Sequence, residues 1–411
     1  MKYSAIILSV LMSSSLSFAA VLKVPEDHKT IPAAIQAASA GDTILIARGT
    51  YVVDSLEVPK TLVLASHFVT SKDADDIAKT IIKASAEAGK GWFDLRPKAK
   101  NTKVIGFTIL GNSRHTMAIR NSYSEVRHCR FIKGKDQLSF ESGGGLVSHC
   151  YFEGSGDEPI DADESLSWTV EYCTFNGSGQ DGLEIRLHPK KGPLTTHIVR
   201  YNTFLRNRGA CIQLVDYEGD SHREFRIYGN IFKNAKNMAV DCTLSSSDGN
   251  TNGSPMAERA IIFNNTFDGC RNGVTMAPGV VLLNNIFTNT RQKGIIRGKY
   301  VKQDGPSIVD YCLFFKNGID YDNGLSIGKH IFAFDPKYLD TTSCKLSPGS
   351  KAIDKGVAAY QWNGAKVLDI PKEQYSGAAP DLGAKESRIK LTAGCIIGNV
   401  SSVGSTELKA D

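Results

Sequence analysis

Short apolar runs recur along this chain and are separated by Gly, Asn and acidic residues. Examples are LVSHCYF, HIVRYNTF and VVLLNNIF, and each is rich in β-branched or aromatic residues. Runs of about 4–8 residues with this composition are typical of strands and are too short for most helices. The pattern therefore predicts an all-β fold built from many short strands.

A marker of Cys or Asn, any residue and then Phe ends most of these runs. Successive markers lie 20 to 35 residues apart, and a turn and a second short run follow them. A repeat of this period is typical of a solenoid. The marker phenylalanines are Phe131, Phe152, Phe175, Phe204, Phe232, Phe267, Phe287 and Phe314.

Among solenoids, the repeat favours a parallel β-helix, because the leucine lattice of leucine-rich repeats is absent from the sequence. We expect the marker phenylalanines to point inward and to stack in one column. Four asparagines are expected to form a ladder at a turn, where their amides can satisfy unpaired backbone groups. They are Asn202, Asn230, Asn265 and Asn285.

Both ends of the predicted solenoid have features of their own. In Lys29–Ala40, Thr30 has the position of an N-cap, Pro32 stands where Pro is tolerated early in a helix, and an apolar stripe follows. We expect this helix to cap the first rung, since an open end leaves strand edges unpaired. We interpret residues 20–324 as the β-helix, and residues 325–411 as the last rungs and an irregular C-terminal cover.

Residues 1–19 have the pattern of a secretory signal peptide. Lys2 precedes an apolar run, and the segment ends in small residues near Ala19. The apolar run is too short for a membrane span, and no later run approaches one. The sequence therefore predicts a secreted protein, extracellular or periplasmic, without a membrane span.

Charge and cysteine content add little to this interpretation. The formal net charge of +5 suits an anionic partner without requiring one, and we expect a monomer with no nucleic-acid partner. Cys344 and Cys395 lie outside the repeat, and the sequence leaves their pairing open. Four other cysteines stand two residues before a marker phenylalanine, so we expect packed thiols. They are Cys129, Cys150, Cys173 and Cys312.

Acidic residues introduce three short runs within residues 134–191. When Leu138, Ile160 and Leu183 are aligned as neighbours, the residues one and three positions after them fall into two columns that point outward. Neighbouring parallel strands lie about 4.8 Å apart, so many carboxylates would share one face. Like charges this close are costly unless a cation lies among them. The columns are Ser139, Asp161 and Glu184, and then Glu141, Asp163 and Arg186.

We interpret this face as a Ca²⁺ site, because Ca²⁺ takes about six to eight oxygen ligands, largely from carboxylates and carbonyls. A comparable set of His and Cys is absent from the sequence, which argues against Zn²⁺. The alternatives are a solvated acidic face and a purely structural Ca²⁺. The predicted ligands are Asp136, Asp157, Glu158 and Asp161, with Glu141, Asp163 and Glu184 as further candidates.

Several segments resemble secreted right-handed parallel β-helix proteins of the pectate-lyase-like superfamily. They are IPAAIQAASAGDTILIARGTY, the NNTF and NNIF repeats, FDPKYLD, SPGSKAIDKG and PDLGAKE. The resemblance covers nearly the whole chain after the signal peptide and implies a right-handed β-helix. The superfamily includes lyases, hydrolases, esterases, epimerases and binding proteins, so the resemblance specifies a fold rather than a reaction.

The acidic stretch resembles the metal site of calcium-dependent pectate lyases of polysaccharide lyase family 9. In that family an Asp precedes one strand, and the next rung carries Asp-Asp-Gly, a hydrophobic residue and Asp. Asp136 stands at the first place here and the segment Asp157–Asp161 at the second. The third family element contains a Lys that acts as the base, and Glu184 stands there instead.

A looser resemblance is to polysaccharide lyase family 6, which includes alginate lyases and chondroitinase B. In that family an acidic strand is followed by a Lys base, as Glu184 is followed by Lys190 here. An Arg from the next rung is also expected, but Leu214 and Val215 occupy that region.

The leading hypothesis is a Ca²⁺-dependent polysaccharide lyase that cleaves an acidic, uronate-containing glycan by β-elimination. Lys190, in a predicted loop, or His188 is the predicted base, and Glu184 occupies the family's base position. Arg186 is expected to hold the substrate carboxylate, since a paired Arg holds anions better than it accepts protons. Its alternative role is to pair with neighbouring carboxylates. The predicted substrate-binding residues are Lys191, Gln213, His222 and Arg223.

Two other classes of function stay open. One is a glycoside hydrolase with Glu184 and Asp241, which occupy equivalent positions two rungs apart with Gln213 between them. That places them roughly 9–10 Å apart, near the upper end of the carboxylate separation of inverting enzymes. The other is a non-catalytic glycan-binding β-helix protein.

Overall fold

The computed structural model describes residues 19–121, 123–163, 166–187, 190–216, 221–242, 259–298 and 305–387, without the side chains of residues 187, 190, 191, 216 and 221. Residues 1–18 of the predicted signal peptide lie outside these ranges. No helix within the described ranges is long and apolar enough to cross a membrane.

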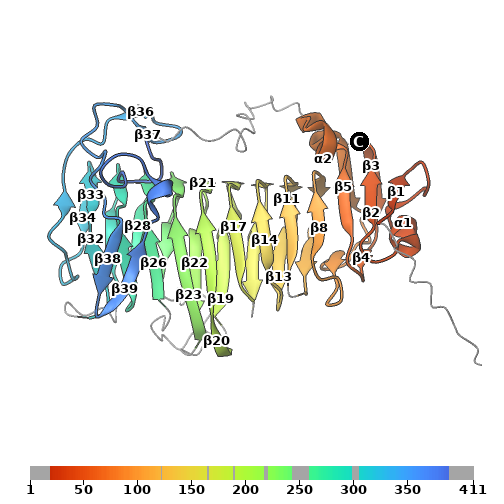
Figure 1. Cartoon of the computed structure of the whole chain (residues 1–411), viewed down its shortest axis with the longest axis horizontal. Coiled ribbons are helices and arrows are strands. Elements are labelled where there is room, and N and C mark those ends of the chain that lie inside the picture. Colours follow the sequence, from red (N-terminus) through yellow and green to blue (C-terminus); the bar gives the residue numbers. More distant parts are fainter. Residues whose placement is uncertain are drawn as a thin grey trace, which may run out of the picture.

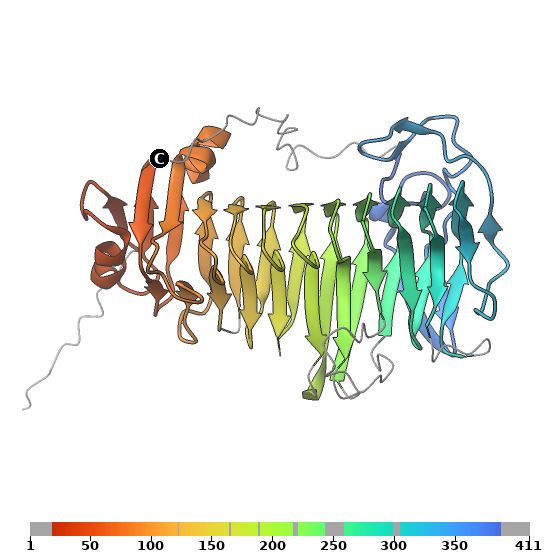
Figure 2. The same cartoon turned by 180° about the vertical axis from the view of Figure 1, so that it is seen from behind.

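Three parallel sheets, here named A, B and C, run along an elongated body (Figure 1 and Figure 2). They contain 12, 12 and 11 strands in the described part of the chain. From β2 onward the chain visits A, B and C in turn, so each strand pairs with its equivalents in the preceding and following coils. This architecture is a parallel β-helix, and the predicted fold class is confirmed.

Sheet A consists, in spatial order, of β1 (Val21–Val24), β2 (Thr43–Ile46), β5 (Val63–Ser66), β8 (Thr102–Ile105), β11 (Ser124–Arg127), β14 (Gly145–Ser148), β17 (Trp168–Glu171), β20 (Lys190–Arg200), β23 (Ser221–Tyr228), β26 (Arg259–Phe263), β29 (Val280–Leu283) and β32 (Ile308–Asp310). Sheet B consists of β3 (Gly49–Val53), β6 (Thr80–Ala84), β9 (Thr108–Leu110), β12 (Arg130–Ile132), β15 (Tyr151–Glu153), β18 (Thr174–Asn176), β21 (Thr203–Leu205), β24 (Ile231–Lys233), β27 (Thr266–Asp268), β30 (Ile286–Thr288), β33 (Cys312–Phe315) and β35 (Ile331–Phe332). Sheet C consists of β4 (Leu56–Val58), β7 (Phe93–Leu95), β10 (Met117–Ile119), β13 (Leu138–Glu141), β16 (Ile160–Asp163), β19 (Leu183–Leu187), β22 (Ala210–Asp216), β25 (Met238–Asp241), β28 (Asn272–Met276), β31 (Lys293–Arg297) and β34 (Ile319–Tyr321).

The marker phenylalanines form one buried column on sheet B, as the repeat predicts. Consecutive rings from Phe131 to Phe314 stack with centroids 4.5 to 5.1 Å apart. This spacing follows from the separation of parallel strands, because equivalent side chains in successive coils lie directly above one another. All eight cysteines in the described ranges are buried and free, in agreement with packed thiols, whereas Cys395 lies outside those ranges.

The predicted asparagine ladder is also present. The Oδ1 atom of Asn230 accepts hydrogen bonds from the backbone N–H and the side-chain amide of Asn202, both at 3.0 Å. Asn230 in turn donates from both groups to Asn265, and its amide also donates to the carbonyl of Val199 at 2.8 Å. Asn265 repeats the pattern with Asn285. The ladder satisfies backbone groups at the turn between sheets A and B, where no strand partner is available.

Replacing Asn230 with Ala is expected to destabilise the protein, because it removes the acceptor of the Asn202 N–H and a donor to the Val199 carbonyl. Each buried polar group left without a partner costs about 1–3 kcal/mol. Urea denaturation of the purified variant measures this cost. An unchanged midpoint would show that the ladder contributes nothing to stability.

The N-terminal end is capped as predicted by α1 (Ile31–Ala37), the helix at the end of the body in Figure 1. The Thr30 hydroxyl accepts a hydrogen bond from the Ala33 N–H at 3.2 Å, which satisfies one free donor of the first turn. Ile31, Ala34 and Ile35 are buried in the core that the first coils share. Two short helices, α2 (Phe68–Ser71) and α3 (Ala74–Lys79), follow β5.

The C-terminal region adds two antiparallel hairpins and a short 3₁₀ helix, η2 (Lys372–Gln374). The first hairpin joins β36 (Tyr338–Asp340) and β37 (Lys345–Leu346), and the second joins β38 (Ala359–Trp362) and β39 (Ala365–Asp369). The second hairpin packs on apolar side chains at the end of sheet A, among them Phe263, Leu283 and Ile308. The boundaries proposed for the chain at residues 20 and 325 stay predictions.

Candidate functional site

Strands β13, β16 and β19 pair in the register that the acidic motif predicts. Leu138, Ile160 and Leu183 are direct partners. The two outward columns follow from this register. They are Ser139, Asp161 and Glu184, and then Glu141, Asp163 and Arg186.

A third column lies in the turns that lead into β10, β13, β16 and β19, two residues before each of these strands begins. Its members are His115, Asp136, Glu158 and Asp181, on four successive coils. The backbone N–H of Gln137 donates to the Glu158 carbonyl at 3.1 Å, and that of Thr116 to the Asp136 carbonyl at 2.8 Å. These bonds extend the parallel pairing into the turns, so carboxylates of neighbouring coils lie about 4.8 Å apart.

Most carboxylates at the centre of this face are buried, whereas Asp157 is half-buried. Asp136 is 3% exposed, and Glu158 and Asp161 are each 4% exposed. Ligand oxygens of Asp136, Asp157 and Glu158 lie within 4.8 Å of one another, and those of Glu158, Asp181 and Glu184 form a second such group. Glu158 belongs to both groups and therefore lies at the centre of what we call the acidic cluster. The acidic cluster consists of Asp136, Asp157, Glu158, Asp161, Asp181 and Glu184.

Burial and mutual repulsion make ionisation of the cluster unfavourable. Loss of hydration, with repulsion from Glu184, Asp157 and Asp136, raises the pKa of Glu158 to about 11. Burial raises the pKa of Asp161 to about 8, although Arg186 opposes this. Burial likewise raises the pKa of Glu184 to about 7, again against the effect of Arg186. At neutral pH the cluster therefore favours a proton or a metal cation among its oxygens.

Arg186 is the cation at one side of the cluster. Its Nη1 lies 3.1 Å from an oxygen of Asp161 and 3.3 Å from one of Asp163, and its Nη2 lies 2.5 Å from Glu184. The predicted pairing of Arg186 with neighbouring carboxylates is therefore present. On the other side, Lys135 lies 3.1 Å from Asp157.

His115 is a member of the site that the motif did not reveal. Its Nδ1 lies 2.8 Å from Oδ2 of Asp136, and burial lowers the pKa of this imidazole. The sequence does contain a sign of this placement. His115 stands two residues before Met117, just as Asp136 stands two residues before Leu138. The run that contains Met117 has no acidic residues before it, so it did not resemble the other three.

The cluster fits a divalent cation that prefers oxygen. The second oxygen of Asp136, Oδ1, is buried and has no hydrogen-bond partner among the described residues. An orphaned buried carboxylate oxygen is costly, and coordination of a cation would satisfy it. Both groups of possible ligands in the described ranges contain only carboxylates, the donors that Ca²⁺ takes and Zn²⁺ rarely uses alone.

The structure brings together three of the four predicted ligands. Asp136, Asp157 and Glu158 share one group, whereas Asp161 belongs to neither group and its carboxylate is held by Arg186. Asp161 is thus adjacent to the proposed site, in register with Glu184, but it already has a partner.

The predicted loop around Lys190 is wrong. Lys190–Arg200 form the 11-residue strand β20 of sheet A. It pairs with β23 at Lys190, opposite Ser221, and again from Thr195 onward, with a register shift between these two points. The eight-residue strand β23 supplies the pairing that a loop would lack. His188 lies outside the described residues, as do the side chains of Lys190 and Lys191.

The remaining predicted residues divide between two sheets. Gln213 pairs with Glu184 on one side and Asp241 on the other, so it continues the first outward column of sheet C. His222 and Arg223 lie on β23 of sheet A instead. The imidazole Nδ1 of His222 is 2.9 Å from the carbonyl of Gly192, and Arg223 is buried. Neither residue belongs to the acidic cluster.

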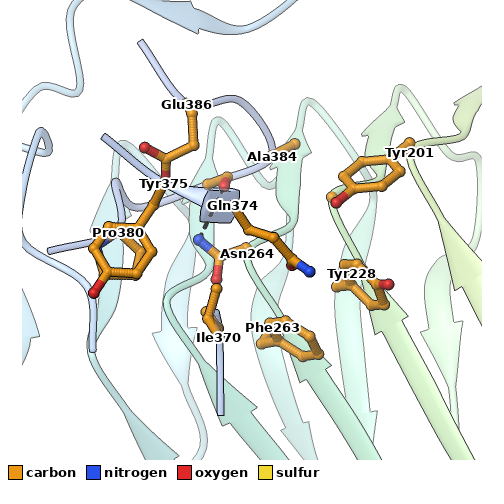
Figure 3. Close-up of a pocket in the computed structure, with 12 residues that line it drawn as sticks. Tyr201, Tyr228, Phe263, Asn264, Ile370, Gln374, Tyr375, Pro380, Ala384 and Glu386 are labelled. Carbon is orange, nitrogen blue, oxygen red and sulfur yellow. Dashed lines mark hydrogen bonds between the residues drawn. The ribbon is translucent and has the colours of Figure 1, made fainter. Parts of the chain in front are cut away.

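A crevice opens between sheet A and the C-terminal region, as Figure 3 shows. Tyr201, Tyr228 and Phe263 line one side, and Tyr375 and Glu386 lie on the other. Its volume of about 50 Å³ has room for little more than water, so it offers no site for a sugar ring.

Comparison with known proteins agrees with the observed fold. A family profile described as a right-handed beta helix region matches residues 98–254. No curated protein sequence matches the chain.

Three solved structures illustrate the likeness. The pectate lyase Pel9A has a TM-score of 0.54 at 13% identity, covering 90% of this chain and 97% of that one. The PL6 family polysaccharide lyase Pedsa3628 from Pseudopedobacter saltans has a TM-score of 0.52 at 15% identity, covering 74% and 90%. A polygalacturonase from Erwinia carotovora ssp. carotovora reaches only 0.38 at 12% identity, covering 78% and 97%. The predicted resemblance to right-handed β-helix proteins of the pectate-lyase-like superfamily is confirmed at the level of the fold.

Proposed function

We propose that this protein is a secreted, Ca²⁺-dependent polysaccharide lyase that cleaves a uronate-containing glycan by β-elimination. The observation that carries the proposal is the buried acidic cluster on sheet C, with Glu158 at its centre and Arg186 at its side. A cluster this acidic has little structural value without a cation, because its carboxylates repel one another. The fold that the chain shares with a pectate lyase is compatible with this reaction class but does not specify it.

In this reaction a base removes the C5 proton of a uronate residue. The electron pair then forms the C4–C5 double bond, and the glycosidic oxygen on C4 leaves and takes up a proton. The C5 proton is weakly acidic, so the negative charge that develops on the neighbouring carboxylate must be stabilised. A Ca²⁺ held by Asp136, Asp157 and Glu158 would supply positive charge for this purpose.

Arg186 is suited to orient the substrate carboxylate. Its guanidinium is fixed by Asp161, Asp163 and Glu184, yet 29% of the side chain is exposed. A guanidinium carries several N–H donors, so one that already pairs with carboxylates can also donate to an incoming substrate carboxylate. The role of Asp161 is then to position Arg186 and to contribute negative charge beside the cation.

The base is proposed to be Lys190 or His188, which follow β19 in the chain. An imidazole can accept a proton near neutral pH without a large pKa shift. A Lys needs its pKa lowered, which nearby positive charge and desolvation would achieve.

Two alanine variants and one glutamine variant test this assignment. Either Lys190→Ala or His188→Ala is expected to lower turnover by about 10²–10⁴-fold, the usual contribution of a general base. Steady-state rates on a polyuronate, with folding checked by circular dichroism, give the result. If both variants keep wild-type turnover while Glu184→Gln abolishes it, the lyase mechanism is wrong.

A glycoside hydrolase is the second candidate, and one observation favours it. Glu184, Gln213 and Asp241 are direct partners on three successive strands, which places the outer two carboxylates about 9–10 Å apart. Inverting hydrolases separate their two carboxyls by about 6.5–9.5 Å. The pKa of Glu184, raised to about 7 by burial, suits a general acid.

Incubation with polygalacturonate, alginate and a glucuronan separates these proposals. A lyase produces an unsaturated uronide that absorbs in the ultraviolet, whereas a hydrolase produces new reducing ends without that absorbance. Binding of these glycans without either product supports a non-catalytic glycan-binding protein and contradicts the proposed reaction.

A further inference from the structure

A second cavity lies far from the acidic cluster, at the C-terminal end of sheet A. It measures about 570 Å³ and opens between β32, the segment that follows β34 and the β38–β39 hairpin. This volume falls in the range of about 300–1,000 Å³ that is usual for small-molecule sites. The side chains that define it are Asp310, Lys329, His330, Tyr360 and Trp362.

Asp310 fixes the geometry of the cavity. The side chain is buried, and its Oδ1 accepts hydrogen bonds from the backbone N–H groups of Tyr311 at 2.9 Å and His330 at 2.8 Å. Its Oδ2 accepts from the hydroxyl of Tyr360 at 3.0 Å. One carboxylate therefore connects β32, the segment around residue 330 and the hairpin. Because the Tyr360 hydroxyl donates to Asp310, its lone pairs stay available as acceptors.

The imidazole of His330 presents a polar edge. Its Nδ1 lies 3.3 Å from Oδ1 of Asp310, and its ring stacks on Tyr311 with centroids 4.1 Å apart. These contacts fix the ring plane while 46% of the side chain stays exposed. With the Nδ1 proton directed at Asp310, Nε2 is the acceptor on the other edge of the ring. It lies 3.4 Å from the hydroxyl of Tyr311, a long contact that a sugar hydroxyl would share or replace. Lys329 adds an exposed cation beside it.

Tyr360 and Trp362 supply apolar surface. They stand two residues apart on β38, so their side chains share the face of the strand that packs toward sheet A. The indole Nε1 of Trp362 donates to the carbonyl of Pro306 at 3.2 Å, which holds the ring in one orientation. Both side chains stay partly exposed at the cavity.

We propose that this cavity binds a pyranose unit of a polysaccharide chain. A pyranose has apolar C–H faces bordered by hydroxyl groups, and the cavity offers the matching combination of fixed aromatic surface and hydrogen-bonding groups. The apolar face would lie on Trp362, and the hydroxyls would contact the Tyr360 hydroxyl, the His330 imidazole and Lys329. The Asp310 carboxylate is already engaged by its hydrogen bonds, so its role is to position these groups and not to contact the sugar.

The position of the cavity gives it a role distinct from the acidic cluster. In sheet A, β32 is five strands from β17, the strand that follows the acidic β16, so the two sites are about 24 Å apart along the axis. A polymer held at both sites would bind more tightly than at either one, because the second contact becomes intramolecular. The inference needs only a glycan partner and does not depend on the lyase reaction.

Tryptophan fluorescence reports on this cavity selectively. The chain has three tryptophans, and Trp92 and Trp168 are each 2% exposed, whereas Trp362 lines the cavity. We titrate the wild-type protein with uronate trisaccharides in one series and with neutral glucan trisaccharides in another. At least one series is expected to change the emission until it saturates. Comparison of the two series distinguishes a charged ligand from a neutral one. The Trp362→Phe variant should lose this response, which assigns the signal to the cavity.

Calorimetry on variants completes the test. Trp362→Ala and His330→Ala are each expected to weaken binding at least tenfold, whereas Leu339→Ala, at an exposed position outside the cavity, should bind like the wild type. Absence of a saturable response in both series, with the fold intact by circular dichroism, overturns the proposal. Unchanged affinity in both cavity variants overturns it as well.

This outcome is separable from that of the proposed reaction. If the protein lacks lyase activity but Trp362 responds to a trisaccharide, only the reaction is wrong. If the lyase is active, Trp362→Ala is expected to raise KM on the polymer several-fold and to leave kcat/KM on a trisaccharide unchanged. An unchanged KM on the polymer contradicts the anchoring role.

Discussion

Replacing Glu158 with Gln is expected to stabilise the protein in chelator and, at the same time, to abolish its response to Ca²⁺. The substitution keeps the shape of the side chain and replaces a carboxyl that the folded protein without a cation holds protonated at neutral pH. Burial, with repulsion from Glu184, Asp157 and Asp136, raises the pKa of Glu158, so folding at neutral pH must protonate this carboxyl at a cost in free energy that a neutral amide does not carry. Glu158 also belongs to both groups of possible ligands, so its loss removes a shared ligand. A functional site that is strained without its ligand shows this opposition between stability and activity.

Thermal denaturation with and without Ca²⁺ measures both effects. In the wild type, Ca²⁺ at 100 times its Kd should stabilise the fold by about 2.7 kcal/mol through mass action. In Glu158→Gln the melting temperature in chelator should be a few degrees higher, the shift with Ca²⁺ should vanish, and lyase activity should fall to background. Persistence of the Ca²⁺ shift in this variant would contradict the assignment of the metal site.

Glu141→Gln provides a matched control. Glu141 lies on the neighbouring strand β13 of the same face, and its carboxylate pairs with Arg120 at 3.1 Å. It belongs to neither group of ligands in the described residues. Loss of a partly exposed ion pair costs about 0–1 kcal/mol, so this variant should keep the Ca²⁺ shift.

The pH dependence of stability in chelator provides a second check on the same cluster. Burial raises the pKa of Asp161 to about 8 and of Glu184 to about 7, so the folded state holds protons that the unfolded state releases. The stabilising contribution of a raised pKa is fully present below the unfolded value of about 4 and is lost as pH rises through the folded value. The melting temperature in chelator should therefore fall between pH 6 and pH 8, and added Ca²⁺ should oppose this fall.

Replacing Phe204 with Ala is expected to cost about 3–5 kcal/mol, the usual loss for a buried Phe. The ring is fully buried and stacks on Phe175 at 4.5 Å and on Phe232 at 5.0 Å. The neighbouring coils are fixed by their own strand pairing, so they cannot close the cavity that the missing ring leaves.

Denaturation in urea measures this cost, and Phe315→Ala is the control. Phe315 ends β33 and is only partly buried, so its truncation should cost much less. Equal losses for the two variants would contradict the inward column.

The fold was predictable because one physical constraint repeats along the chain. Each coil must bury a side chain at the same place, so Phe recurs on sheet B and Asn recurs at the turn before it. The register of the acidic face followed from the same repeat, since aligning Leu138 with Ile160 fixes every position beyond them.

The parts that the sequence did not reveal lack this periodicity. The β38–β39 hairpin occurs once, so no repeat predicts that Tyr360 packs toward β32. His115 occupies an acidic column without being acidic, and it was therefore overlooked. A loop was expected at Lys190 because this residue lies beyond the preceding strand and follows Pro189, but Lys190–Arg200 form a strand that pairs with β23 at Lys190 and again from Thr195.

The most direct test of the central claim is the formation of unsaturated uronide from a polyuronate, followed in the ultraviolet before and after removal of Ca²⁺. The proposed site predicts that the wild-type protein forms this product with Ca²⁺, that an excess of chelator stops the reaction, and that added Ca²⁺ restores it. Formation of the unsaturated product at an undiminished rate in chelator would contradict a functional Ca²⁺ at Asp136, Asp157 and Glu158.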